Sequence, residues 1–67
     1  MNRMKRIREE RGSTQAEICI RTGLHPSTVS RIERDVIKGS QSHRRRIARA
    51  LRVEVGEIFL ETKDEEF

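Results

Sequence analysis

Hydroxyl and guanidinium side chains recur in the middle of this chain at the spacing of one helix face. At about 100° per residue in a helix, Val29 and Ile32 share one side, whereas Ser27, Arg31 and Arg34 fall on the other. Such side chains donate hydrogen bonds to phosphate oxygens and to the edges of bases. The chemistry indicated is recognition of a polyanion, and the arrangement is that of a DNA-reading helix.

Two short helices hinged at one glycine would position this face. Thr14 is a good N-cap residue, and Glu17 three residues later completes the capping-box pattern. Gly23 ends the first helix, because glycine readily adopts the positive φ that helix C-termini commonly need. Pro26, preceded by His25, begins the second helix, since the fixed φ of proline suits the first helical position.

The flanking periodicity predicts three further helices. The five predicted helices cover residues 2–11, 14–22, 26–34, 40–51 and 55–60, with Ser40 or Ser42 as the cap of the fourth. Residues 35–39 break the pattern, and we expect Ile37 to pack under the core from this loop. Apolar and polar residues nowhere alternate over the length of a strand. We therefore expect an all-α domain, a compact five-helix bundle over residues 1–60, followed by an acidic, frayed tail over 61–67.

Charge is unevenly distributed along the chain. The formal net charge is +4, but residues 31–52 carry eight bases and two acids, whereas residues 53–67 carry six acids and one base. This asymmetry indicates one side that faces a polyanion, although surface charge can also serve solubility alone. No apolar run reaches the roughly 20 residues of a membrane span. The single cysteine, Cys19, excludes an internal disulfide and suits a core position, so we expect a cytoplasmic protein without a membrane segment.

Three consecutive arginines, Arg44, Arg45 and Arg46, fall near the predicted start of the fourth helix. The positive end of the helix macrodipole repels such cations by about 0.3 kcal/mol or more each. An anion would reverse this penalty, because guanidiniums and free backbone N–H groups converge there. Arg44 also lies on the apolar seam, so we expect its methylenes on the core and its guanidinium in solvent or on a phosphate. A solvated charge run is the alternative interpretation.

Taken in order, these residues resemble the XRE-type helix-turn-helix family, the fold of the phage repressor and Cro proteins. The resemblance covers about residues 3–60, and its segments are REERG at 8–12, TQAEI at 14–18, TG at 22–23, STVSRIER at 27–34 and IARALRVEVGEIF at 47–59. One glycine turn would be weak support, but these segments in this order and spacing are highly specific. The resemblance implies a lambda repressor-like DNA-binding domain.

The resemblance also implies roles for individual residues. The positions that face base edges in the major groove are Ser27, Thr28 and Arg31. Arg31 is the chief candidate reader, because a guanidinium bonds both O6 and N7 of guanine. Gln15 corresponds to a residue that contacts phosphate and braces the recognition helix, and Arg8 and Glu33 match a structural ion pair between the first and third helices. The residues expected at DNA phosphates are Thr14, Gln15, Ser30, Arg34, Lys38, Arg44 and Arg45.

The chain departs from the family pattern at Pro26, where many relatives carry a long polar side chain that contacts a base. Proline offers at most apolar packing against a thymine methyl group, so specificity should shift to Ser27 and Arg31. The residues that are polar at usually apolar positions are Ser13, Thr22, Gln41 and Arg44. These polar residues leave fewer apolar side chains for an already small core. We therefore expect a free energy of unfolding below the usual range of about 5 to 15 kcal/mol, unless a dimer or DNA contributes.

Neither an enzyme nor a metal site is expected. Catalysis needs a convergent acid, base or nucleophile, but Cys19, His25 and His43 are scattered through different elements, and no CxxC or HxxxH spacing is present. We therefore expect no cofactor, no metal and no small-molecule ligand. RNA binding is disfavoured, because the chain has no tyrosine or tryptophan and only two phenylalanines to stack on bases.

A protein-interaction module is the competing hypothesis, because antitoxins and scaffold modules use the same fold. Ala16 and Ile20 would form a small apolar patch that faces away from the core, and a protein partner such as a toxin stays open. We nevertheless expect a repressor that binds a pseudo-palindromic, double-stranded DNA operator as a homodimer. In the last helix Ile58 and Phe59 are expected to close the core, and these two residues with Val55 are also candidate contributors to the dimer.

Overall fold

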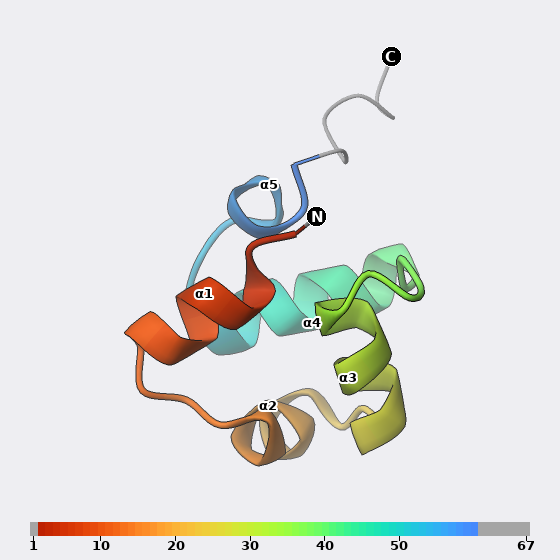
Figure 1. Ribbon diagram of the computed structural model, residues 1–67, viewed down its shortest axis with the longest axis horizontal. Helices are drawn as coiled ribbons and strands as arrows, with labels where there is room; N and C mark the ends of the chain where they lie inside the picture. The colour runs from red at the N-terminus through yellow and green to blue at the C-terminus, as the bar shows by residue number, and fades with distance from the viewer. Residues whose placement is uncertain (1, 61–67) are drawn as a thin grey trace.

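Residues 2–60, which the computed structural model describes, form five α-helices and contain no strand (Figure 1). The helices are α1 (Met4–Glu10), α2 (Gln15–Thr22), α3 (Pro26–Glu33), α4 (Gln41–Leu51) and α5 (Val55–Ile58). The predicted all-α class and the order of the helices are confirmed. α2 packs against both α3 and α4, and α5 packs against α4. The tail over 61–67, for which fraying was predicted, lies outside the described residues, as does Met1.

Local hydrogen bonds explain where α2 and α4 begin. The Thr14 hydroxyl accepts the Glu17 N–H at 3.1 Å, and the Glu17 carboxylate accepts the Thr14 N–H at 2.8 Å, which completes the capping box. At α4 the cap is Ser40, whose hydroxyl accepts the His43 N–H at 3.1 Å, and Ser42 lies inside the helix. Each cap satisfies an N–H that the helix leaves unpaired, so each helix starts at a residue chosen by local chemistry.

A glycine and a threonine close the turn between α2 and α3. Gly23 adopts φ +75°, and its N–H donates to the Cys19 carbonyl at 2.8 Å. The buried Thr22 hydroxyl donates to the Ile18 carbonyl at 2.6 Å and accepts the Leu24 N–H at 3.2 Å. Thr22 therefore stands at a usually apolar position without leaving its hydroxyl unsatisfied in the core.

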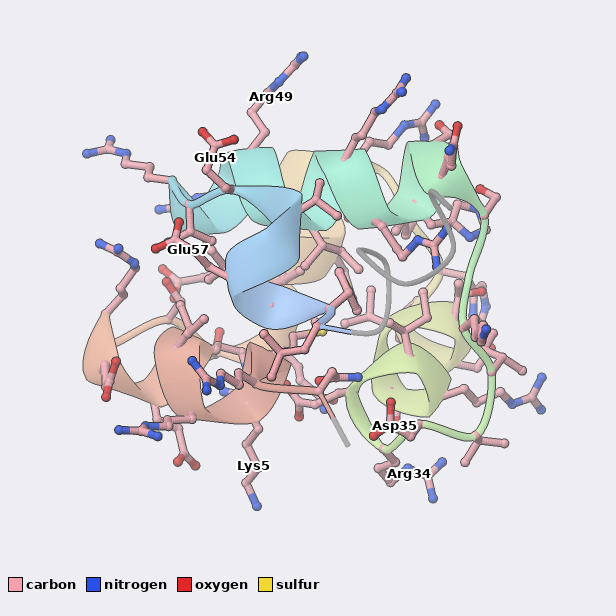
Figure 2. All side chains as sticks on the ribbon, turned by 90° about the horizontal axis from the view of Figure 1, so that it is seen from above. Lys5, Arg34, Asp35, Arg49, Glu54 and Glu57 are labelled. Atoms are coloured by element: carbon pink, nitrogen blue, oxygen red, sulfur yellow. The ribbon has the colours of Figure 1, made fainter. Side chains whose placement is uncertain are left out.

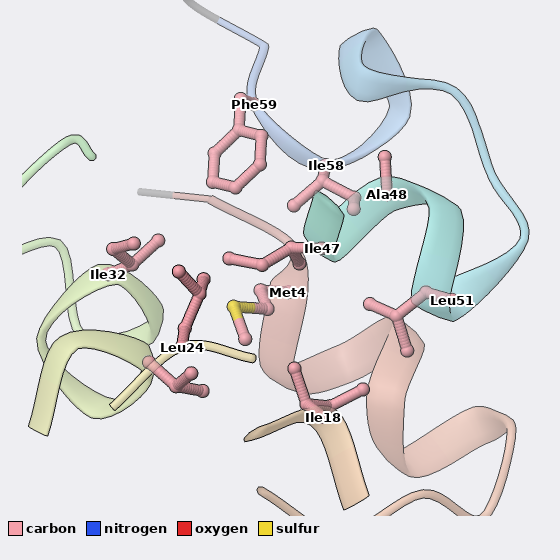
Figure 3. Packing of buried hydrophobic residues seen from close by; sticks show 10 residues of the cluster. Met4, Ile18, Leu24, Ile32, Ile47, Ala48, Leu51, Ile58 and Phe59 are labelled. Atoms are coloured by element: carbon pink, nitrogen blue, oxygen red, sulfur yellow. The ribbon is translucent and has the colours of Figure 1, made fainter. Parts of the chain in front are cut away.

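One apolar core is shared by all five helices and by the turn after α2 (Figure 3). Its buried members are Met4, Ile18, Leu24, Val29, Ile32, Ile47, Ala48, Leu51, Ile58 and Phe59. Cys19 is half-buried and packs against this cluster, as does Val55. The expectation that Ile58 and Phe59 close the core is confirmed, because they are 0% and 2% exposed within the single chain. The same burial contradicts the suggestion that these two residues contribute to a dimer surface. These side chains close the core of their own molecule.

The loop after α3 is built differently from the expectation. Ile37 is 40% exposed and does not pack under the core. The backbone of Gly39 lies against Ile32 instead, so closely that a Cβ atom at Gly39 would stand 2.7 Å from Ile32 Cδ1. Gly39 also adopts φ +79°, so both the close approach and the conformation require glycine. Gln41, at another usually apolar position, is exposed on the first turn of α4.

Candidate nucleic-acid interface

The outer face of α3 carries the residues predicted to face base edges. Val29 and Ile32 are 0% exposed, whereas Ser27 and Arg31 are exposed and Thr28 is half-buried. The aliphatic side chains therefore point into the core, and the hydroxyl and guanidinium groups lie on the side facing solvent. The structure therefore has the helical phase that the sequence predicted for residues 26–34. Contact of these residues with DNA bases stays a prediction.

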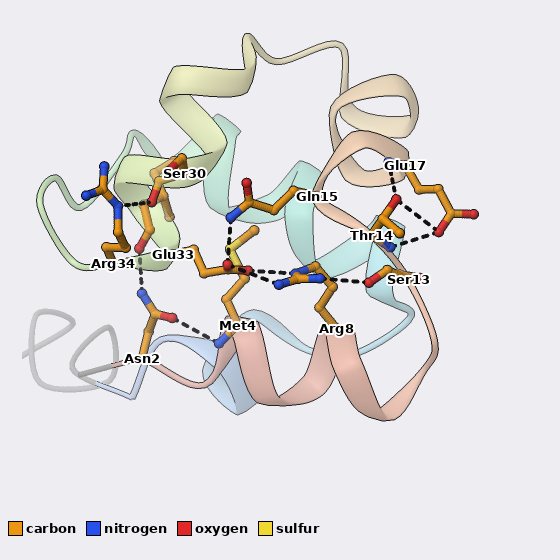
Figure 4. A network of polar contacts seen from close by, with 11 residues as sticks. Asn2, Met4, Arg8, Ser13, Thr14, Gln15, Glu17, Ser30, Glu33 and Arg34 are labelled. Atoms are coloured by element: carbon orange, nitrogen blue, oxygen red, sulfur yellow. Dashed lines mark hydrogen bonds and ion pairs between the residues drawn. The ribbon is translucent and has the colours of Figure 1, made fainter.

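Glu33, at the end of α3, is held by one side chain from α1 and one from α2 (Figure 4). Its carboxylate accepts hydrogen bonds from Arg8 Nε at 2.8 Å, from Arg8 Nη2 at 3.2 Å and from Gln15 Nε2 at 2.7 Å. Arg8 also donates Nη1 to the Ser13 carbonyl at 2.9 Å. The side chains of Arg8 and Glu33 are 12% and 5% exposed. The ion pair implied by the family resemblance is present as a buried bidentate pair, with Gln15 as its third member.

Burial and hydrogen bonding act in opposite directions on this network. Burial raises the pKa of Glu33, but the hydrogen bonds from Arg8 and Gln15 and the charge of Arg8 together outweigh it and leave this pKa below its usual value. The hydrogen bond to Glu33 raises the pKa of Arg8, although burial opposes it. Both groups are therefore charged at neutral pH, and the pair fastens the C-terminal end of α3 to α1.

Gln15 is the first residue of α2, and its amide joins the start of that helix to the end of α3. This hydrogen bond accounts for the bracing part of its expected role. The amide has a second N–H, so a phosphate contact is compatible with the brace. Thr14 is exposed at the same helix start, but its hydroxyl is engaged in the cap.

Asn2 forms a second clamp on α3 that sequence reasoning missed. Its side-chain amide donates to the Ile32 carbonyl at 2.7 Å and to Asp35 Oδ1 at 2.8 Å, and its backbone N–H donates to Asp35 Oδ2 at 2.9 Å. Asn2 Oδ1 accepts the Met4 N–H at 2.9 Å. An asparagine just before a helix is a recognisable cap signal. No local sequence pattern indicated the contact between Asn2 and Asp35, because these residues are 33 positions apart.

The residues predicted to contact phosphates lie in three places. They are Thr14 and Gln15 at the start of α2, Ser30, Arg34 and Lys38 on α3 and in the loop after it, and Arg44 and Arg45 on α4. Arg34 and Lys38 are exposed and Ser30 is half-buried. Arg34 Nε donates to the Ser30 carbonyl at 3.4 Å, and Figure 4 shows this side chain beside the end of α3.

The arginine run of α4 is divided between two faces. Arg44 is 8% exposed, so the expectation that its guanidinium extends into solvent is wrong. The reason is its helical phase, which puts Arg44 one turn before Ile47 and Ala48 on the inner face. A depression of about 440 Å³ on the outer face is lined by Gln41, Ser42, Arg45, Arg46 and Arg49. This depression, which we call the α4 basic surface, presents three guanidiniums.

Arg49 was not among the predicted contacts, although the sequence carried a signal for it. Arg45 and Arg49 are four residues apart, so one face of α4 presents both side chains. Figure 2 shows Arg49 projecting outward from this helix. The helical phase that places Arg44 on the inner face of α4 places Arg46 and Arg49 on the outer face. It would therefore have predicted Arg46 and Arg49 as phosphate contacts in place of Arg44.

Residues 2–60 contain no group of three His, Cys, Asp or Glu side chains placed to hold a metal ion. His25 and His43 lie at the starts of α3 and α4, where each engages backbone N–H groups of the helix start. Among these residues no helix has both the length and the apolar character needed to cross a membrane.

Comparison with known proteins gave one finding. A helix-turn-helix family model matches residues 4–58 of the chain. No match was found among curated proteins or among solved structures. The matched range contains all five helices, the Arg8–Glu33 pair and the outer face of α3.

Proposed function

Since the chain belongs to the XRE-type helix-turn-helix family, and is in general terms a DNA-binding regulator, we propose that it binds a specific double-stranded operator and represses transcription there. α3 enters the major groove, with Ser27, Thr28 and Arg31 toward the base edges. Arg31 reads guanine through O6 and N7, and the hydroxyl groups read neighbouring bases.

The observation that carries this proposal is the division of α3 into two faces. Ser27 and Arg31 are exposed, whereas Val29 and Ile32 are fully buried. The far end of the helix is fastened by Arg8 to α1. A reading helix must be held in this way, because base contacts discriminate only when the side chains approach the groove in one orientation.

Exposed cations in the loop after α3 and on α4 support the same role. Arg34 and Lys38 follow the helix, and the α4 basic surface contributes Arg45, Arg46 and Arg49. We propose that these groups bind the phosphates that flank the groove, which sets the register of α3 without reading sequence. Arg44, which is 8% exposed, is left out of this proposal.

We propose that the operator is pseudo-palindromic and is bound by a two-fold dimer. α3 has eight residues and is therefore about 12 Å long. That length spans about four base pairs, which is too few to specify one site in a genome. Two copies of α3 one DNA turn apart would double the number of base pairs read. Large aliphatic side chains outside α2 that are exposed for a dimer contact are Val36, Ile37 and Leu60.

Selection of bound duplexes from random DNA tests this proposal. We expect enrichment of an inverted repeat that contains guanine in each half-site, and affinity that falls log-linearly with salt as phosphate counterions are released. Arg31→Ala should relax the preference at the guanine and cost about 1 to 3 kcal/mol of binding free energy. Arg6→Ala, which removes another exposed arginine, is the matched control. A selection that enriches no sequence would overturn the proposed function.

A protein-interaction module, such as the antitoxin of a toxin–antitoxin pair, is the second candidate. The observation that favours it is Ile20, which is 81% exposed on α2, on the same side as the exposed Ala16 one turn earlier. Such a contact would be apolar and would hardly respond to salt, whereas phosphate binding weakens steeply. Ile20→Ser should leave DNA affinity unchanged and weaken only the binding of a protein partner.

A further inference from the structure

His25 and Ser27 form a hydrogen-bonded unit at the tip of α3. His25 is the N-cap residue, with φ −65° and ψ 143°. Its ring nitrogen Nδ1 accepts the Ser27 N–H at 3.1 Å and lies 2.9 Å from Ser27 Oγ. Both residues are exposed, so the unit stands on the surface that the proposed function turns toward DNA.

These two contacts assign the protons of the unit. A ring nitrogen that accepts the Ser27 N–H carries no proton of its own, so it has none to give to the Ser27 hydroxyl. The 2.9 Å contact is therefore one in which Ser27 Oγ–H donates to Nδ1. The proton of the neutral imidazole is then on Nε2. With its only hydrogen turned toward the ring, Ser27 Oγ presents lone pairs to any other partner.

We propose that His25 determines sequence specificity by making Ser27 a hydrogen-bond acceptor toward DNA. This inference rests on the proposed function and concerns one base of the operator. An acceptor pairs with the amino group of adenine or cytosine and meets an oxygen at the same place on guanine or thymine. On the strand that Ser27 faces, the operator therefore carries an amino base.

The histidine is what makes this serine selective. A serine hydroxyl normally rotates to donate or to accept, which is why it reads bases poorly. Here the hydroxyl donates to Nδ1, so a rotation that aims its hydrogen at a base would break that hydrogen bond. An adenine-to-guanine or a cytosine-to-uracil change isolates this effect, because each keeps the size class of the base, replaces the amino group with a carbonyl and adds no methyl group to the major groove.

The test begins with the operator selected by the wild-type protein. The base pair read by Ser27 is the one whose preference disappears when selection is repeated with Ser27→Ala. We expect an amino base there, and the corresponding base change at that position should weaken wild-type binding about five- to tenfold in a fluorescence-anisotropy titration. In His25→Gly the same base change should alter the affinity less than about twofold, because the hydroxyl can then donate or accept.

His25→Gly suits this purpose because glycine is tolerated at an N-cap position and costs only a few tenths of a kcal/mol there. Circular dichroism checks that the variant keeps its helices. The inference is overturned if the base at the Ser27 position is a keto base, or if His25→Gly keeps the full wild-type preference there. In either case, binding of the operator by the wild-type protein still supports the proposed function. If no sequence is enriched, both fail.

The tautomer of His25 offers a readout that needs neither a variant nor DNA. Long-range ¹H–¹⁵N correlation spectra of the free wild-type protein at neutral pH distinguish a proton on Nε2 from one on Nδ1. We expect Nε2–H. A proton on Nδ1 would overturn the inference, because the ring would then donate to Ser27 Oγ and free the hydroxyl to donate.

Discussion

Replacing Arg8 by alanine tests whether the buried ion pair holds α3 in place. The change removes both hydrogen bonds from Arg8 to Glu33 and the bond to the Ser13 carbonyl. Glu33 keeps the hydrogen bond from Gln15 at Oε1, but Oε2 loses its arginine donor. A carboxylate whose side chain is 5% exposed is then left without its counter-ion.

The magnitude follows from this burial. Removing one partner of a buried ion pair costs about 3 to 5 kcal/mol, because the other charge stays desolvated. Gln15 still donates to the carboxylate, and Arg8 is itself 12% exposed, so we expect the lower end, about 3 kcal/mol. That is a large part of the stability of so small a domain. Arg6→Ala is the matched control, since the Arg6–Glu10 pair is 74% and 61% exposed, and such a pair contributes about 0.5 kcal/mol or less.

The cost of Arg8→Ala should depend on pH. The pKa of Glu33 is lowered in the folded chain, so the stability contributed by the pair is fully present above the unfolded pKa, about 4.3. It is lost as the pH falls through the folded pKa. Without Arg8, only the hydrogen bond from Gln15 and the charge of Lys5 still oppose the effect of burial, so the pKa of Glu33 is higher in the variant than in the wild type. The difference in stability between the two proteins is therefore greatest at neutral pH and narrows in acid.

Urea denaturation followed by far-ultraviolet circular dichroism measures this difference, since the chain has no tryptophan for fluorescence. Wild type, Arg8→Ala and Arg6→Ala are compared in steps from pH 7 to about pH 2, a range that extends well below the unfolded pKa of a glutamate. A cost of Arg8→Ala below about 1 kcal/mol, within the range of an exposed pair, would refute the reasoning. So would a cost that stays constant across the pH range.

Three further outcomes are expected. Gly39→Ala should destabilise the protein by at least about 2 kcal/mol in thermal denaturation, because its Cβ would meet a buried isoleucine, whereas Gly12→Ala, with the same sign of φ and open space, should cost about 1 kcal/mol. Arg45→Glu combined with Arg46→Glu should weaken binding to all DNA sequences alike and lower the log–log salt slope by about two; a loss confined to one sequence would contradict the phosphate role. Asp35→Gly should be about 1 kcal/mol more stable to urea than Asp35→Ala, since both lose the bonds to Asn2 but glycine accommodates φ +61°.

The sequence by itself determined the helices and the two faces of α3. Thr14 caps α2 through Glu17, three residues away, and Gly23 ends that helix through Cys19, four residues away. The separation of Ser27 and Arg31 from the buried face follows from the helical period alone. Such features depend on neighbours within one turn of the helix, and for this reason local chemistry predicted them.

Only the tertiary structure decided which side chains the core would take. Ile37 was expected inside and is exposed, whereas the backbone of Gly39 lies against the buried Ile32. Phe59 was expected in the core and also in a dimer contact, and the fold places it in the core of its own chain. Composition marks both residues as apolar, but burial depends on whether a neighbouring segment covers them first, and packing between segments far apart in the chain sets that.

The contacts that hold the reading helix divide in the same way. The family resemblance implied the pair between Arg8 and Glu33, whereas the clamp between Asn2 and Asp35 emerged only from the fold. The unit formed by His25 and Ser27 could be predicted only in part. Its residues are two positions apart, yet the sequence predicted only a helix start there, because the direction of the imidazole ring and the placement of its proton are properties of the folded geometry.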